Sequence, residues 1–182
     1  MAGSDGGGGS TCPGTLPEVA IRFDGCDAFT ACGGDPTGTW VYQDICAADL
    51  VPDATSVCAM ARVEDLMGTA RGCVALDGAN VARDVSGEIS ATIVVPLSCT
   101  FGMGCGPIET ALSVTCTESG GECRCPYSTS WSENSSDTYT IAGNTLTTGD
   151  GTAYDFCVAG SALTYVESGA AAAEPGIVGL TR

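Results

Sequence analysis

The sequence has no histidine and no lysine, and its six basic residues are all arginine. Without histidine the chain cannot form a Ser-His-Asp triad, a Cys-His nucleophile or an ordinary zinc hydrolase site. Without lysine it cannot form a Schiff base or a P-loop. A glycosidase with two carboxylates stays open, because 22 acidic residues are present, but most of these stand in predicted turns beside glycine, serine or asparagine. The composition therefore favours a protein that is not an enzyme.

The sequence also lacks any Cys-x-x-Cys motif, although it contains 12 cysteines. Zinc ribbons and iron–sulfur sites normally need cysteines two residues apart, and the nearest approach is Cys123-Arg-Cys125. That pair also lacks the geometry that activates a redox thiol. Structural disulfides are the better interpretation, and they indicate an oxidising compartment. The candidate cysteines are the neighbours Cys26 and Cys32, the neighbours Cys99 and Cys105, and Cys116 opposite Cys123 in a predicted hairpin; the full connectivity stays open.

Positive charge is scarce, and the net charge is −16. Nucleic acid is excluded as a natural partner, and anionic membrane surfaces are disfavoured, because both require clustered cations. Solubility explains this charge, with a cation-binding surface as the alternative. We predict no cofactor and no metal site. Calcium stays open at Asp24–Asp27 and Gly149–Asp155, where acidic residues stand on turns, but turn formation alone explains both segments.

No apolar run reaches the roughly 18 residues that a membrane-spanning helix needs. Residues 1–10 have neither the charged start nor the apolar centre of a signal peptide. Because disulfides form in exported proteins, we expect a mature form whose leader has been removed. The Gly/Ser-rich residues 1–15 are predicted to be a flexible tether, and residues 16–182 to be a single domain.

Short apolar segments separated by turns dominate the rest of the chain. A strand is predicted over Gly38–Cys46, with Trp40, Tyr42, Asp44 and Cys46 on one face. Helical spacing of Val57, Met60, Val63 and Met67 predicts one helix, capped by Asp53 and ended by Gly72. Further strands are predicted over Val19–Phe23 and Ile89–Leu97, and a hairpin over Ala111–Thr117 and Glu122–Trp131, after a glycine-rich loop at Thr100–Pro107.

From Tyr139 to Leu180, apolar residues alternate with polar ones, and glycine stands at every break. This pattern is typical of an antiparallel meander. We therefore predict an all-β fold, an antiparallel up-and-down β-barrel of about eight or nine strands with one short helix and several disulfides. Its interior would form a ligand pocket lined by Trp40, Tyr139, Ile141, Phe156, Leu163 and Tyr165.

Gly38-Thr39-Trp40 resembles the Gly-x-Trp signature of lipocalins, and Arg182 resembles the late arginine that packs across that tryptophan. Over residues 32–182 the layout resembles the cysteine-rich, lipocalin-like secreted lipoproteins of myxobacteria and their relatives. The resemblance rests on four segments, which are 32–40, 123–125, 139–146 and 155–163. It implies a secreted domain, or one anchored to the outer membrane, with no established activity. A lipidated cysteine normally begins such proteins, whereas this sequence has no lipobox, so anchoring is an inference.

Two functional classes follow. In the first, the barrel binds a small apolar ligand outside the cell. In the second, the barrel is filled by its own side chains, and the domain is a structural or adhesive protein of the cell envelope that self-assembles or binds a partner protein. An internal cavity would favour the first, and a packed interior with an apolar outer patch the second.

Overall fold

The computed structural model describes residues 12–48, 54–56, 58–169 and 176–182. Most of them lie in a ten-stranded sheet, as predicted for an all-β fold. The strands are β1 (Val19–Arg22), β2 (Gly38–Cys46), β3 (Arg62–Asp77), β4 (Asn80–Pro96), β5 (Thr117–Ser119), β6 (Glu122–Ala142), β7 (Thr145–Thr148), β8 (Ala153–Ala159), β9 (Ala162–Ser168) and β10 (Ile177–Thr181). One α-helix, α1 (Gly106–Leu112), and the 3-10 turns η2 (Ala54–Ser56) and η3 (Leu97–Thr100) complete the described elements.

The strand pairing closes on itself. The antiparallel pairs run β2–β3, β3–β4, β4–β6, β6–β7, β7–β8, β8–β9, β9–β10 and β10–β2. The ring follows chain order apart from β5, which is the predicted up-and-down arrangement. β1 lies outside the ring, parallel to β2 and antiparallel to β3. Closure satisfies backbone groups that an open sheet would expose at its edges.

Cross-strand partners share one face of a sheet, so the register identifies the side chains that point into the ring. Gly72, Val74 and Leu76 of β3 are on that face, together with Val81 and Val85 of β4. With residues from β2 and β6–β10 they form the main hydrophobic core. Trp40, Phe156, Leu76 and Leu180 are its largest fully buried side chains.

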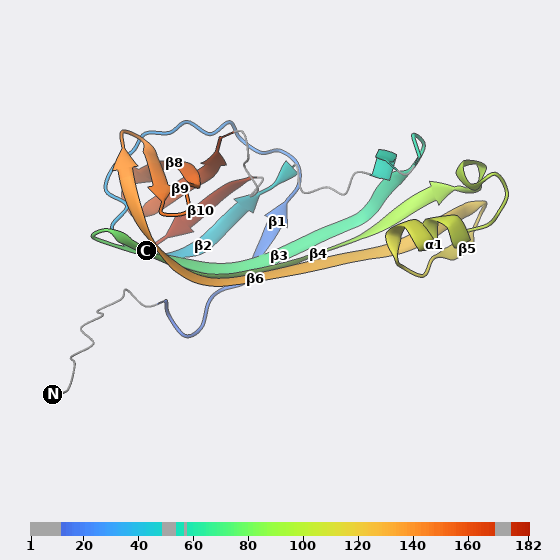
Figure 1. Cartoon of the computed structure of the whole chain (residues 1–182), viewed down its shortest axis with the longest axis horizontal. Coiled ribbons are helices and arrows are strands. Elements are labelled where there is room, and N and C mark those ends of the chain that lie inside the picture. Colours follow the sequence, from blue (N-terminus) through green and yellow to red (C-terminus); the bar gives the residue numbers. More distant parts are fainter. Residues whose placement is uncertain (1–11, 49–53, 57, 170–175) are drawn as a thin grey trace.

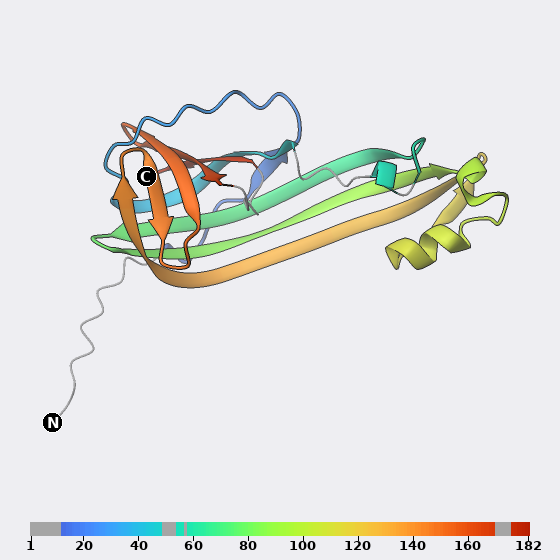
Figure 2. The same cartoon turned by 45° about the horizontal axis from the view of Figure 1, so that its top comes forward.

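β3, β4 and β6 are far longer than the strands beside them, with 16, 17 and 21 residues. Fully extended, β6 would measure about 70 Å. The three strands continue past the ring as a three-stranded arm (Figures 1 and 2). Nothing in the sequence analysis predicted this arm.

A second, smaller core stabilises the far end of the arm, which we call the tip: η2, η3, α1, β5 and the adjoining ends of β3, β4 and β6 (Figure 1). Its buried residues are Ala54, Ala61, Ile93, Val95, Ile108, Cys123 and Cys125. The described strands all belong to one sheet, so this core is completed by Ile108 of α1 and by the cysteines of the local disulfides.

Six disulfides use all 12 cysteines. Three lie in the part of the chain that forms the ring, Cys12–Cys73, Cys26–Cys46 and Cys32–Cys157, and three at the tip, Cys58–Cys99, Cys105–Cys123 and Cys116–Cys125. All six candidate cysteines are in disulfides, but the predicted Cys116–Cys123 pairing is wrong, since Cys116 bonds to Cys125 and Cys123 to Cys105. The neighbours six residues apart are not joined to each other either. The hairpin register was wrong by two residues: Glu118, and not Cys116, lies opposite Cys123.

The predicted helix over residues 53–72 is also wrong, since most of this segment forms β3, and Asp53 and Val57 lie outside the described residues. Met60 and Met67 are exposed, so their helical spacing does not mark a packed face. A bulge between Glu64 and Met67, with Asp65 in a left-handed conformation, shifts the strand alternation in β3.

The observed helix lies where a loop and a strand were predicted. Pro107 stands at its first turn, and Ser113 ends it in a left-handed conformation, as is usual at helix ends. The predicted alternation in β2 is interrupted as well. Gly179 pairs with Asp44 and Leu180 with Tyr42, so Gln43 is an extra residue. Asp44 is therefore exposed, and Ile45 is buried.

The Val19–Phe23 segment forms β1, beside the ring. The predicted tether falls largely on residues 1–11, which lie outside the described residues. Cys12, near its end, is attached to β3 by its disulfide with Cys73.

Candidate functional site

The ring encloses one small apolar cavity of about 50 Å³ that is partly open to solvent. Its walls are Pro36, Val74, Leu76, Val81, Arg83, Leu146, Thr148, Tyr154, Phe156, Leu163 and Tyr165. Such a volume exceeds the space needed for one water molecule but is well below the ~150 Å³ of a cavity that binds benzene. The interior is thus filled mainly by its own side chains.

The structure brings three of the predicted pocket residues, Phe156, Leu163 and Tyr165, to the cavity wall. Trp40 and Tyr139 are buried in the same core without lining the cavity. Ile141 is 42% exposed and lies away from the cavity. Although it pairs with the buried Leu146, it stands at the end of β6, where few strands cover it.

Arg83 and Tyr154 also border the cavity, and neither was predicted from the sequence. Arg83 Nη1 donates a hydrogen bond of 2.9 Å to Tyr154 Oη, and its guanidinium also lies 5.5 Å from the centre of that ring. Glu133 is 3.9 Å from the same nitrogen. The sequence pattern could have identified Arg83, because it stands between Val81 and Val85 at a position that alternation assigns to the interior.

Two further tyrosine contacts hold this wall. Tyr165 meets Tyr154 edge to face with the ring centres 5.6 Å apart, and its hydroxyl lies 3.4 Å from that of Tyr42. Edge-to-face pairs are favoured by the ring quadrupoles. The accessible wall of the cavity is therefore apolar, since the polar groups of Arg83 and Tyr154 bond to each other and do not face the space.

The contact expected between Arg182 and Trp40 is present. The guanidinium of Arg182 lies 4.7 Å from the centre of the Trp40 ring, which has no exposed surface. Trp40 Nε1 donates to the carbonyl of Pro36 at 2.7 Å. Arg182 donates to the carbonyls of Thr37 and Gly160, at 3.2 and 3.4 Å. Pro36 also borders the cavity, so the same residue contacts both Trp40 and the cavity.

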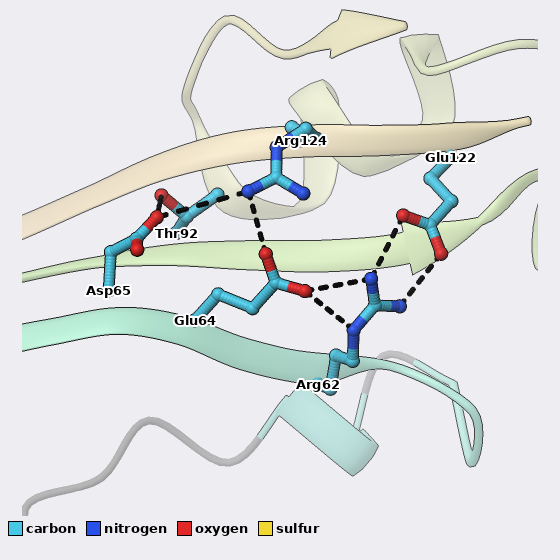
Figure 3. Close-up of polar contacts among 6 residues, drawn as sticks. All are labelled: Arg62, Glu64, Asp65, Thr92, Glu122 and Arg124. Carbon is cyan, nitrogen blue, oxygen red and sulfur yellow. Dashed lines mark hydrogen bonds and ion pairs between the residues drawn. The ribbon is translucent and has the colours of Figure 1, made fainter. Parts of the chain in front are cut away.

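A second polar cluster lies on the arm, near the tip (Figure 3). Arg62 donates to both Glu122 and Glu64, and Arg124 donates to Glu64 at 2.7 Å. The hydrogen bond from Arg124, followed by that from Arg62, lowers the pKa of Glu64 below its usual value, and the hydrogen bond from Arg62 lowers the pKa of Glu122.

The cluster joins β3 to β6 across β4 (Figure 3). Each arginine is neutralised by a carboxylate within the cluster. The cluster therefore has the arrangement of an ion-pair network that holds strands together, rather than that of a catalytic site.

Hydrogen bonds occupy the acidic side chains of Gly149–Asp155, one of the two segments considered for calcium. Asp150 accepts hydrogen bonds from Thr148 Oγ1 and from the Thr152 amide, at 2.6 and 2.9 Å. These bonds lower the pKa of Asp150 and build the turn, as turn chemistry predicts. Asp155 accepts from Thr145. Within the described ranges, no three His, Cys, Asp or Glu side chains gather as a metal site would need, at Asp24–Asp27 or elsewhere.

Six disulfides indicate an oxidising compartment. Among the residues that the structure describes, no helix has the length and hydropathy needed to cross a membrane. Neither protein-family models nor curated proteins give a match to this chain.

Proposed function

We propose that this protein is an extracellular or cell-surface binding domain of lipocalin type, without enzymatic activity, whose barrel takes a small apolar group. The observation that carries the proposal is the apolar cavity inside the closed ring, bordered by Arg83 and Tyr154. The packing of Arg182 over Trp40 supports the lipocalin resemblance. The disulfides support secretion, and anchoring to an outer membrane as a lipoprotein is the finer part of the proposal.

The small volume limits the ligand. About 50 Å³ holds a few heavy atoms, so a whole fatty acid or a fused-ring compound does not fit. A short alkyl group fits this apolar space.

Native mass spectrometry of protein from its own host, before and after denaturation, tests the proposal. We expect a bound small molecule that is released on denaturation. In a second test, xenon is applied under pressure while the methyl resonances of Leu146 and Leu163 are followed by NMR, because a single atom suits this volume. Leu146→Phe should fill the cavity and abolish the shifts of Leu163, whereas Ile141→Phe, on the same face but outside the cavity, should preserve them. Absence of both a bound molecule and any xenon shift in the unmodified protein would contradict the proposal.

A structural role in the cell envelope is the second candidate, and the packing of the ring supports it. Trp40, Phe156, Leu76 and Leu180 are fully buried, so side chains fill most of the interior. A bare monomer mass would favour this role, and a ladder of oligomers would do so more strongly.

A further inference from the structure

Three of the six large apolar side chains that are exposed in the described residues lie at the tip. Phe101 is 90% exposed, and Met103 and Met60 are 65% and 58% exposed. The disulfide Cys58–Cys99 joins the segment that carries Met60 to the loop that carries Phe101. In both views these segments lie at the end of the arm away from β8–β10 (Figures 1 and 2).

The loop that carries Phe101 is held in this exposed position. Phe101 has φ +53°, a left-handed conformation that is unfavourable for an aromatic residue. The Met103 amide donates to the Thr100 carbonyl at 3.0 Å and closes a tight turn, and Thr100 itself is buried. Disulfides attach the chain on both sides, at Cys99 and at Cys105. The phenyl ring therefore cannot easily fold back onto the arm, and such strain often marks a functional position.

The two tip segments carry no charge, although the chain has 22 acidic residues and six arginines. No charged residue occurs in Leu97–Ile108 or in Ala54–Ala61. Moving a charged group toward hydrocarbon is costly, so a charge-free segment with exposed aromatic and thioether side chains is suited to the boundary between lipid headgroups and acyl chains. One carboxylate lies beside this loop, since a β-carbon added to Gly104 would stand 3.7 Å from Glu118 Oε2.

We propose that the tip binds a zwitterionic lipid surface by inserting Phe101 and Met103 between its headgroups. A lipid interface needs no complementary shape, which suits exposed side chains on a short loop. The net charge of −16 disfavours anionic lipid. With only two or three inserted side chains, binding is expected to be weak and reversible. The proposal concerns the end of the molecule away from the cavity and does not depend on the cavity's ligand.

Co-sedimentation of the full oxidised chain with phosphatidylcholine vesicles tests this proposal. Phe101→Asn keeps a residue that tolerates a left-handed conformation, and it should lower the partition coefficient about tenfold. Met103→Ser should weaken binding several-fold. The matched control is Met67→Ser, because Met67 has the same 65% exposure as Met103 but lies on β3 away from the tip. It should leave binding unchanged.

A Phe101→Trp variant adds a direct readout, since its emission should shift to shorter wavelength and be quenched by brominated lipid. The native Trp40 is buried, and Trp131 lies along β6, so neither should respond. The proposal is overturned if the unmodified chain fails to sediment with these vesicles. It is also overturned if Met67→Ser loses as much binding as Met103→Ser, or if binding requires charged lipid. Unchanged melting temperatures exclude misfolding as the cause of a loss.

Discussion

At the scale of single residues, Trp40 contributes most to the interior of the ring. It has no exposed surface, its indole nitrogen is bonded to Pro36, and Arg182 covers its ring. The cation–π contact adds roughly 0.5–2 kcal/mol to what burial contributes. Few other large side chains are available for this position, because only 6% of the residues are aromatic.

Trp40→Ala should lower the free energy of unfolding by about 3–5 kcal/mol, because it removes a fully buried ring from a core that cannot collapse to fill the space. Equilibrium denaturation in urea measures this loss. Arg182→Met serves as the comparison, since it keeps much of the packing and should cost only about 1 kcal/mol. A loss well below 1 kcal/mol for Trp40→Ala would show that the indole does not support the core.

Gly72 is required because a ring lies directly on it. A β-carbon added there would stand 2.7 Å from two atoms of the Tyr42 ring and 2.9 Å from a third. Tyr42 is buried and cannot swing away, so we expect Gly72→Ala to cost about 1–3 kcal/mol. Gly106→Ala, at a position with open space around it, is the matched control. Equal melting temperatures for the two variants would refute this prediction.

At the scale of elements, bulges decide which side chains the strands present to the core. The extra residue Gln43 reverses the alternation of β2, and the bulge after Glu64 does the same in β3. That second bulge is next to the Arg62–Glu64–Arg124 cluster, which holds the three long strands together beyond the ring (Figure 3).

This cluster predicts a pH dependence. Arg124 and Arg62 lower the pKa of Glu64, and Arg62 lowers that of Glu122. A lowered pKa in the folded state contributes stability above the ordinary value of 4.5, and that stability is lost as the pH falls through the folded value.

Melting temperature should therefore fall more steeply below pH 4.5 for the unmodified chain than for Glu122→Gln. The two curves should converge as the pH falls through the lowered pKa of Glu122. The effect should be modest and sensitive to salt, because the groups are exposed. Parallel curves would contradict the prediction.

At the scale of the whole molecule, two small cores are each held by three disulfides. The Cys32–Cys157 bond joins residues 125 apart and closes nearly the whole ring-forming chain. In the chain-entropy description, a loop of this length contributes about 4–5 kcal/mol. At the tip, bonds as short as the nine-residue Cys116–Cys125 connection replace the second sheet that would otherwise cover the core.

Strong reductant should lower the melting temperature severely. Hydrogen exchange followed during partial reduction should show the tip losing protection independently of the ring, because the two cores share only the arm strands. An unchanged melting temperature in reductant would contradict the structural role of the disulfides. Simultaneous loss of protection at both ends would contradict the independence of the cores.

Local patterns in the sequence determined much of this protein. Alternation and glycine breaks from Tyr139 to Leu180 predicted the meander, because period-two burial and turn geometry depend on near neighbours. The count of cysteines without Cys-x-x-Cys predicted disulfides, and the inward-facing positions Phe156, Leu163 and Tyr165 lie at the cavity wall.

Only the tertiary structure decided the disulfide partners, the arm and the size of the cavity. Each depends on contacts between residues far apart in the chain, such as Cys32 with Cys157 and β4 with β6 along its whole length. The helical spacing of Met60 and Met67 could not reveal a bulged strand, because the bulge exists only in register with β4. Alternation predicts which side chains point inward, but the space left between them depends on how all eight ring strands pack together.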